Sequence, residues 1–217
     1  MTDDAVFQTM TRCGVVPVVV LESAEAALPL ADALLEGGLP LIEITFRTAA
    51  AAEAIKRISR HRPELLVGAG TLVTAENVEA AADSGARFGV APGLNPQRVE
   101  QARRRGMVFV PGVCTPSERE RALELQCSLL KFFPAEASGG VETLKAVAAP
   151  YGHLGVRFLP TGGVNMANLA SYLGIAAVAA VAGTWIATKA DIAAGKWAEI
   201  RDRCKRAAEV VAQVRGT

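Results

Sequence analysis

A lysine inside an apolar segment is the residue of this sequence whose position most strongly suggests chemistry. Lys131 lies in the middle of residues 128–134 (SLLKFFP), which read as a short buried strand, apolar on both faces, whereas the other five lysines lie in polar or helix-like stretches. An ammonium group buried without a partner tends to lose its proton, and a neutral amine can attack a carbonyl carbon to form a Schiff base. The alternative is a lysine whose head group reaches solvent or a salt bridge at the strand end.

A carboxylate and a guanidinium occupy alternate positions of a second apolar segment. Residues 39–46 read as a strand that runs into Arg47. Because side chains alternate between the two faces of a strand, Glu43, Thr45 and Arg47 share one face. If that face points inward, a carboxylate and a guanidinium line the mouth of a barrel.

The elements that must position these side chains alternate along the chain. Alanine-rich segments with helical periodicity separate eight apolar, strand-like runs, which cover residues 15–20, 39–46, 65–70, 86–92, 107–113, 128–134, 156–162 and 178–183. Ser23, Thr74 and Asn165 are predicted to cap the start of helices. Strands that alternate with helices pair in parallel through right-handed crossovers.

This alternation predicts an α/β fold, a (β/α)₈ TIM barrel that forms a single domain over residues 1–217. An extra N-terminal helix, over about residues 3–12, would cover the floor of the barrel. A doubly wound open sheet is the alternative. It would usually have fewer strands and a glycine fingerprint after the first strand, and residues 20–23 carry no such fingerprint.

Two glycine-rich turns follow the last two predicted strands, where barrels often bind phosphate. One is formed by residues 161–164 (TGGV), before a helix expected to begin at Asn165, and the other by residues 183–185 (GTW). Backbone amides in a glycine turn at the start of a helix bind anions, so the two turns together predict a phosphate site. The alternative for each turn alone is an ordinary tight turn.

The composition indicates a globular protein and excludes several function classes. Hydrophobic residues make up 51% of the chain and charged residues 21%, and a net charge of +1 gives no general attraction to nucleic acid or to a membrane surface. Four scattered cysteines lack the spacing of a metal site and are expected to be free thiols, and His61 and His153 are expected at the surface. We find no apolar run long enough for a membrane span and no signal-peptide pattern in the first four residues, so we expect a cytoplasmic protein.

Taken together, these residues resemble the 2-keto-3-deoxy-6-phosphogluconate (KDPG) aldolase family. The similarity extends from Gly14 to about Gly195, and its motifs are residues 42–48 (IEITFRT), 68–71 (GAGT), 92–94 (PGL), 111–113 (PGV), 131–136 (KFFPAE) and 160–164 (PTGGV). The resemblance implies a class I aldolase that uses a lysine Schiff base, needs no metal or other cofactor, acts on a small phosphorylated keto acid and assembles as a homotrimer.

The resemblance also implies a role for each site residue. Lys131 would be the Schiff-base lysine and Glu43 the acid/base group, and Arg47 and Thr71 would bind the pyruvate carboxylate. The other implied substrate contacts are Pro92 and Phe133 at the pocket wall, Thr161 at the substrate hydroxyls, Gly162, Gly163 and Gly183 at the phosphate, and Thr184. The family often has serine at the last of these positions, so a hydroxyl is kept while the extra methyl group could change rate or substrate range.

The implied reaction is cleavage of KDPG to pyruvate and D-glyceraldehyde 3-phosphate in the Entner–Doudoroff pathway, with 4-hydroxy-2-oxoglutarate as a plausible second substrate. One alternative is the galactonate-configured relative, 2-dehydro-3-deoxy-6-phosphogalactonate aldolase. Such relatives tend to carry an arginine at the end of the first strand and to lack the threonine before the glycine turn, where this chain has Val20-Leu21 and Thr161. The alternative from another class is a non-catalytic barrel that binds a sugar phosphate, which need not keep Glu43, Arg47 and Lys131 together.

Overall fold

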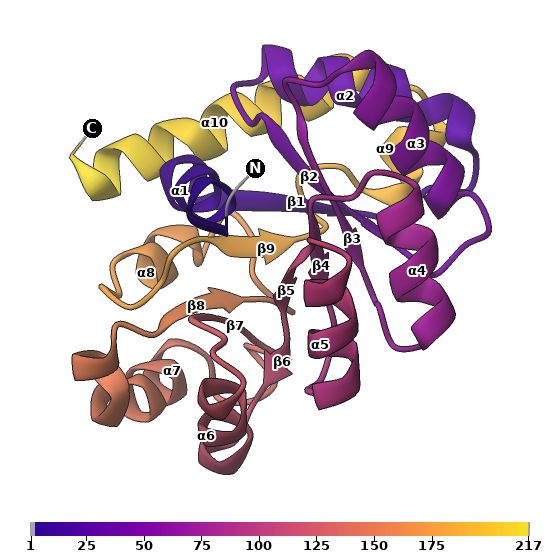
Figure 1. The fold of residues 1–217 in the computed structure, drawn as a ribbon. Coiled ribbons are helices and arrows are strands. Elements are labelled where there is room, and N and C mark those ends of the chain that lie inside the picture. Colours follow the sequence, from indigo (N-terminus) through magenta and orange to yellow (C-terminus); the bar gives the residue numbers. More distant parts are fainter. Residues whose placement is uncertain (1–2, 217) are drawn as a thin grey trace.

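The computed structural model describes residues 3–216 as alternating strands and helices (Figure 1). The strands are β1 (Val15–Val19), β2 (Leu41–Thr45), β3 (Leu66–Gly70), β4 (Phe88–Val90), β5 (Val108–Val110), β6 (Gly112–Val113), β7 (Leu129–Phe132), β8 (Arg157–Pro160) and β9 (Val181–Gly183). The helices are α1 (Asp3–Cys13), α2 (Ala27–Glu36), α3 (Ala51–His61), α4 (Ala75–Asp83), α5 (Pro96–Arg104), α6 (Pro116–Glu124), α7 (Gly140–Ala148), α8 (Leu169–Leu173), α9 (Lys189–Ala193) and α10 (Trp197–Arg215), with 3₁₀ helices η1 (Ala24–Ala26) and η2 (Ala149–Leu154). Each apolar run predicted as a strand contains strand residues, within narrower bounds.

The strands form two parallel sheets. Six strands pair in the order β5-β4-β3-β2-β1-β9, and three pair in the order β6-β7-β8. Isolated parallel bridges, Phe158 with Val178 and Thr161 with Ala182, link the segments of β8 and β9. In Figure 1 the helices lie outside the strands, with α4 and α5 on one side of the molecule and α6 and α7 beside the smaller sheet. The predicted α/β class with parallel strands is confirmed, and the parallel strands are arranged as a half-barrel.

The run at residues 107–113 forms two short strands and not the one continuous strand that was predicted. β5 pairs with β4, whereas β6 pairs with β7. Proline has no N–H to donate to a ladder, so Pro111 interrupts the run. Its carbonyl oxygen accepts a 2.9 Å hydrogen bond from the N–H of Lys131. The chain therefore passes from one sheet to the other at Pro111.

Two of the three predicted helix caps are confirmed, and the third is wrong. Thr74 and Ser23 cap α4 and η1 through their side-chain hydroxyls. The helix expected to begin at Asn165 begins at Leu169. The Oδ1 atom of Asn165 accepts the N–H of Ala167 at 2.8 Å, which closes a turn ahead of the helix.

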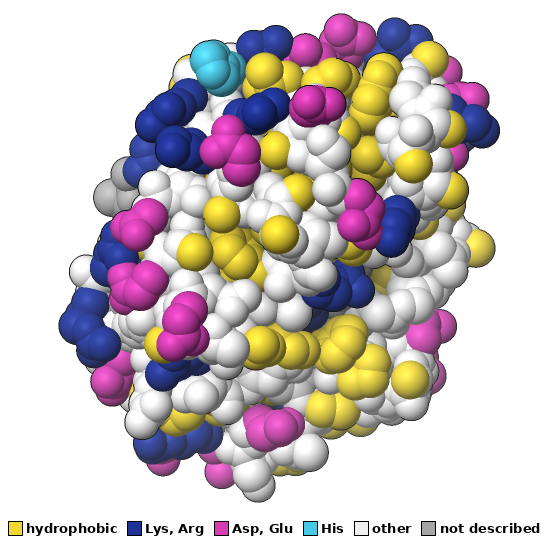
Figure 2. Space-filling model, turned by 90° about the vertical axis from the view of Figure 1, so that its right-hand side faces the viewer, with side chains coloured by type: hydrophobic (Ala, Val, Ile, Leu, Met, Phe, Trp, Pro, Cys, Tyr) yellow, Lys and Arg dark blue, Asp and Glu magenta, His cyan; other side chains and the backbone are white. Residues whose placement is uncertain are grey.

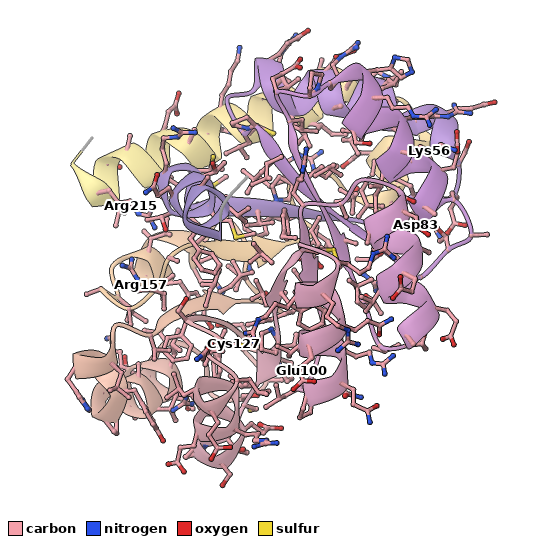
Figure 3. The ribbon with its side chains drawn as sticks, in the orientation of Figure 1. Lys56, Asp83, Glu100, Cys127, Arg157 and Arg215 are labelled. Atoms are coloured by element: carbon pink, nitrogen blue, oxygen red, sulfur yellow. The ribbon has the colours of Figure 1, made fainter. Side chains whose placement is uncertain are left out.

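The helices are amphipathic and bury one face each. The buried residues of α3 recur at helical spacing and are Ala51, Ala54, Ile55 and Ile58. Helix α3 contacts β2 and β3 through this face. Figure 3 shows Lys56, Asp83 and Glu100 on the outer sides of α3, α4 and α5, where all three are exposed.

The predicted N-terminal helix is present as α1. Val6 and Met10 are buried, and the helix contacts β1 and β2. It therefore packs on the strands that carry part of the site described below. Met1 and Thr2, on which the expectation of a cytoplasmic protein partly depends, lie outside the described residues.

The surface matches the balanced composition. Figure 2 shows charged side chains of both signs interspersed on the face that it presents. The four cysteines are free thiols, and His61 and His153 are exposed, as the sequence predicts. Between residues 3 and 216, the helices include none that is both long and apolar enough to span a bilayer.

Candidate active site

A cavity of about 320 Å³ opens where the strands end. Its lining residues are Val18, Glu43, Thr45, Arg47, Thr71, Pro92, Lys131, Phe133, Thr161, Gly162, Gly163, Val164, Gly183 and Thr184. Every residue that the sequence predicted for the site is among them. The cavity adds Thr45, which strand alternation already places on the face of Glu43, and two apolar wall residues, Val18 and Val164, whose types carry no chemical signal.

Strand β7 places Lys131 in this cavity with only 6% of the residue exposed. In the ladder it lies between Gly112 on β6 and Leu159 on β8. Its Nζ atom lies 5.2 Å from the centre of the Phe133 ring, within the range of a cation–π contact. The other five lysines are exposed. Lys131 is therefore the one buried lysine of the six, and it lines the cavity.

Strand β2 places the Glu43 carboxylate in the same cavity, with 1% of the residue exposed. Its Oε2 atom is buried and has no hydrogen-bond partner among the described residues. Burial raises the pKa of Glu43, and the positive charges of Lys131 and Arg47 partly oppose this shift. A side chain on the neighbouring strand would not fit, because a Cβ atom on Gly70 would lie 2.0 Å from Oε1 of Glu43. The site thus holds a desolvated carboxyl group, one oxygen of which has no partner among the described residues, and such a group suits proton transfer.

Polar groups at the ends of β2 and β3 complete this side of the cavity. Arg47 Nε donates a 3.3 Å hydrogen bond to Oγ1 of Thr45, which itself donates to the Val19 carbonyl at 3.1 Å. The guanidinium is exposed and keeps further donors for an anion. Thr71 follows β3 with a φ of 60°, in the left-handed region that threonine seldom adopts. Strained residues of this kind concentrate at functional sites.

The turn after β8 presents backbone amides to the cavity. Gly162 and Gly163 have φ values of 95° and 83°. The Gly162 carbonyl accepts the N–H of Glu136 at 3.0 Å, and the Gly163 carbonyl accepts the side-chain amides of Asn165 and Asn168 at 3.1 and 3.2 Å. No backbone carbonyl among the described residues accepts the N–H of either glycine. Successive backbone N–H groups that stay free in a turn can form an anion-binding nest.

The expected contribution of helix N-termini to this nest is wrong. Helix α8 begins at Leu169 and α9 at Lys189, so neither begins at its glycine turn. The donors available to an anion are the amides of the turns themselves.

The second turn is shaped by an aromatic ring. A Cβ atom on Gly183 would lie 2.2 Å from the Trp185 ring, so only glycine fits at the end of β9. Thr184 is exposed beside it. Thr161 bridges to Ala182 and donates its hydroxyl to the Leu159 carbonyl at 3.2 Å, which brings the two turns together at one end of the cavity.

The comparison with protein families agrees with this geometry. The model of the KDPG and KHG aldolases matches residues 6–203. The chain belongs to the KDPG and KHG aldolase family. Among curated relatives in the family, the 2-dehydro-3-deoxy-phosphogluconate aldolase of Treponema pallidum is 42% identical over 95% of this chain and 97% of its own length. The enzyme of the same name from Haemophilus influenzae is 44% identical over 92% of this chain and 93% of its own length.

Solved structures of the family show the same fold. A KDPG aldolase from Legionella pneumophila, with pyruvate captured as a covalent carbinolamine, superposes with a TM-score of 0.87 at 35% identity and covers 92% of this chain and 96% of its own. A structure described as native KDPGal superposes with a TM-score of 0.82 at 24% identity, over 94% of this chain and 96% of its own. At that identity the likeness shows the fold alone.

Proposed function

We propose that this chain is a class I aldolase that cleaves KDPG to pyruvate and D-glyceraldehyde 3-phosphate through a Schiff base on Lys131. One observation supports the proposal: a single cavity holds a buried lysine, a buried carboxyl group with one unpartnered oxygen among the described residues, and glycine-turn amides that donate to no backbone carbonyl of those residues. A nucleophile, a proton shuttle and an anion site are what retro-aldol cleavage of a phosphorylated keto acid needs. A lyase with these parts requires no cofactor.

The reaction begins when the Lys131 amine attacks the C2 ketone to form a carbinolamine, which takes up a proton from solvent and loses water. The resulting protonated imine withdraws electrons from the C3–C4 bond. As that bond breaks, Glu43 takes the proton of the C4 hydroxyl, and the aldehyde leaves. Glu43 then returns the proton to C3 of the enamine, and water hydrolyses the resulting iminium ion to pyruvate, the free amine and the proton taken up at the start.

The other lining residues hold the substrate at its two ends. Arg47 and Thr71 bind the carboxylate next to C2 through charge-assisted hydrogen bonds. Pro92 and Phe133 form the wall beside the pyruvate half. Around the phosphate and the substrate hydroxyls we place Thr161, Gly162, Gly163, Gly183 and Thr184.

We also propose that the two sheets close as one (β/α)₈ barrel, within a single domain over residues 1–217. The passage of the chain between sheets at Pro111 and the bridges from β8 to β9 support closure. A homotrimer in the cytoplasm follows from the family resemblance and is part of the same proposal. Light scattering on the purified protein tests the oligomer directly.

Trapping with borohydride tests the chemistry. The protein is incubated with pyruvate, reduced and mapped by mass spectrometry, with Lys131→Ala as the negative variant and Lys145→Ala, at an exposed lysine, as the matched control. We expect an adduct on Lys131 in the parent and in the control. An adduct on another lysine, or the absence of an adduct, would contradict the assignment of Lys131 as the Schiff-base lysine. Steady-state cleavage of KDPG and of its galactonate epimer then identifies the substrate.

A further inference from the structure

A buried tyrosine lies behind the glycine turn that we assign to the phosphate. Tyr172, on α8, is fully buried and donates its hydroxyl to Oε1 of Glu136. Neither residue lines the cavity. Burial and the bond to Glu136 raise the pKa of Tyr172, so the phenol stays protonated and remains a donor over the working range of pH.

Glu136 packs directly against the turn. A Cβ atom on Gly163 would lie 2.5 Å from both Cβ and Cγ of Glu136, and one on Gly140 would lie 3.2 Å from Oε1 of Glu136. The backbone N–H of Glu136 donates to the Gly162 carbonyl at 3.0 Å. The position of the Glu136 side chain therefore fixes the path of the two glycines.

The negative charge of Glu136 lies next to the turn that we assign to the phosphate, which is also negative. A carboxylate beside an anion site repels the anion unless it is held away from it. The Tyr172 hydroxyl engages one carboxylate oxygen on the side of α8, close to Gly140. A hydrogen bond to a charged group is also stronger than one between neutral groups, which suits it to restraining a loop.

We propose that the Tyr172–Glu136 hydrogen bond is a brace that holds the Gly162–Gly163 turn in its anion-receiving shape and keeps the carboxylate away from the phosphate. This inference rests on the proposed function and adds two positioning residues to it. Both act through the turn and not on the reacting atoms. The brace therefore governs affinity for the phosphorylated end of the substrate and leaves the chemistry at Lys131 unchanged.

Tyr172→Phe removes the hydroxyl and keeps the ring. We expect KM for KDPG to rise about tenfold, the change that corresponds to about 1.4 kcal/mol of binding free energy, with kcat within about twofold of the parent. The kcat/KM for 4-hydroxy-2-oxoglutarate, which has no phosphate, should not change. The matched control is Tyr151→Phe, because Tyr151 is the chain's other tyrosine and donates to Glu120 at 3.0 Å away from the cavity. It should change neither substrate.

A double-mutant cycle separates the brace from general loosening of the loop. Glu136→Met keeps Cβ and Cγ against Gly163 and removes the acceptor. Tyr172→Phe should raise KM in the parent and leave it unchanged in the Glu136→Met background, because the acceptor of the hydrogen bond is already absent there. An equal KM increase from Tyr172→Phe in both backgrounds would contradict the proposed brace. Equal losses of kcat/KM on KDPG and 4-hydroxy-2-oxoglutarate would contradict it too.

Binding of inorganic phosphate gives a readout that needs no turnover. Its Kd, measured by calorimetry, should also rise about tenfold in Tyr172→Phe and stay constant in Tyr151→Phe. A parent that binds phosphate but does not cleave KDPG contradicts the proposed function and leaves the brace testable by this measurement. A parent that cleaves KDPG while Tyr172→Phe keeps the parental phosphate Kd and KM contradicts the brace alone.

Discussion

At the scale of single residues, the environment of Glu43 connects stability with activity. Its carboxyl group is buried, one oxygen has no partner among the described residues, and burial raises its pKa above the ordinary value of 4.5. The folded protein therefore holds this proton more tightly than the unfolded chain does. Protonated Glu43 therefore adds to the stability of the fold. This contribution is complete at pH values below the pKa of the unfolded chain and is lost as the pH rises through the raised pKa of the folded protein.

Glu43→Gln should separate the two properties. The amide cannot shuttle protons, so we expect turnover to fall about 10²–10⁴-fold. Because the amide carries no ionisation cost, the variant should melt above the parent at about pH 8, by about 2–4 °C for each 1 kcal/mol gained, and the difference should shrink toward about pH 4. Thermal melts at both values check this. A melting difference that grows toward low pH contradicts the assigned direction.

Gly70 tests the space that Glu43 occupies. A Cβ atom there would lie 2.0 Å from Oε1 of Glu43, so Gly70→Ala should displace the carboxylate. We expect kcat to fall by about 10²-fold, the typical cost of a misplacement of about 1 Å. Gly93→Ala is the control, because a Cβ atom there would have no neighbour within 4 Å. Equal kcat values in the two variants would show that the position of Glu43 does not limit the reaction.

Thr161 tests the choice between C4 epimers. Thr161→Val keeps the shape and removes a buried hydroxyl that lines the cavity next to the phosphate turn. We expect kcat/KM for KDPG to fall, with a loss of about 1–3 kcal/mol in transition-state stabilisation. The ratio of kcat/KM for KDPG to kcat/KM for its galactonate epimer should decrease. Parallel kinetics on the two substrates measure this ratio. An unchanged ratio would remove Thr161 from the specificity assignment.

At the scale of elements, the turn after β8 receives its shape from both of its neighbours. In the loop after β7, the N–H of Glu136 donates a hydrogen bond to the Gly162 carbonyl. The side-chain amides of Asn165 and Asn168 donate to the Gly163 carbonyl. Gly162→Asp should raise KM for KDPG more than about tenfold and leave 4-hydroxy-2-oxoglutarate much less affected, because it adds a charge and a Cβ atom beside the free amides. Gly155→Asp is the control: Gly155 has a φ of 69°, with no neighbour within 4 Å of a Cβ atom. Equal losses on both substrates would show that the turn is only structural.

The sequence predicts these elements to different depths. Lys131 could be found because a charge interrupts an apolar run, and Arg47 because alternation places it on the face of Glu43. The division of residues 107–113 into two strands at Pro111 could not be predicted, because it depends on β5 pairing with β4 and β6 pairing with β7. Asn165 has the residue type of a helix cap but closes a turn, and only the later start of α8 reveals it. The contact of Tyr172 with Glu136 joins residues 36 positions apart, beyond any local pattern.

At the scale of the whole molecule, the last helix packs against elements from both the first and the last parts of the chain. Helix α10 contacts α2, α8 and β1. It packs tightly against Gly37, the residue that ends α2, where a Cβ atom would lie 2.4 Å from Cβ of Cys204 and 2.9 Å from the Arg201 carbonyl oxygen. The packing of the two helices therefore depends on the missing side chain.

Gly37→Ala should destabilise the fold through this contact alone. Its φ of −82° suits any residue, so the cost is steric. We expect a loss of about 1–3 kcal/mol in unfolding free energy, measured by urea denaturation. Gly152→Ala, which has open space around the new Cβ atom, should stay within about 0.5 kcal/mol of the parent. Similar losses in both variants would indicate that the helix contact is not tight.

The hydrogen bond between the Pro111 carbonyl and the Lys131 N–H attaches the proposed Schiff-base lysine to the residue where the chain changes sheets. A local opening that moves β7 away from Pro111 breaks this bond and withdraws the amine from the cavity, although the six-stranded sheet keeps its ladder. Such subglobal openings need less free energy than complete unfolding. Amide hydrogen exchange at Lys131 therefore reports how often β7 opens, and we expect each such opening to interrupt catalysis while the larger sheet stays folded.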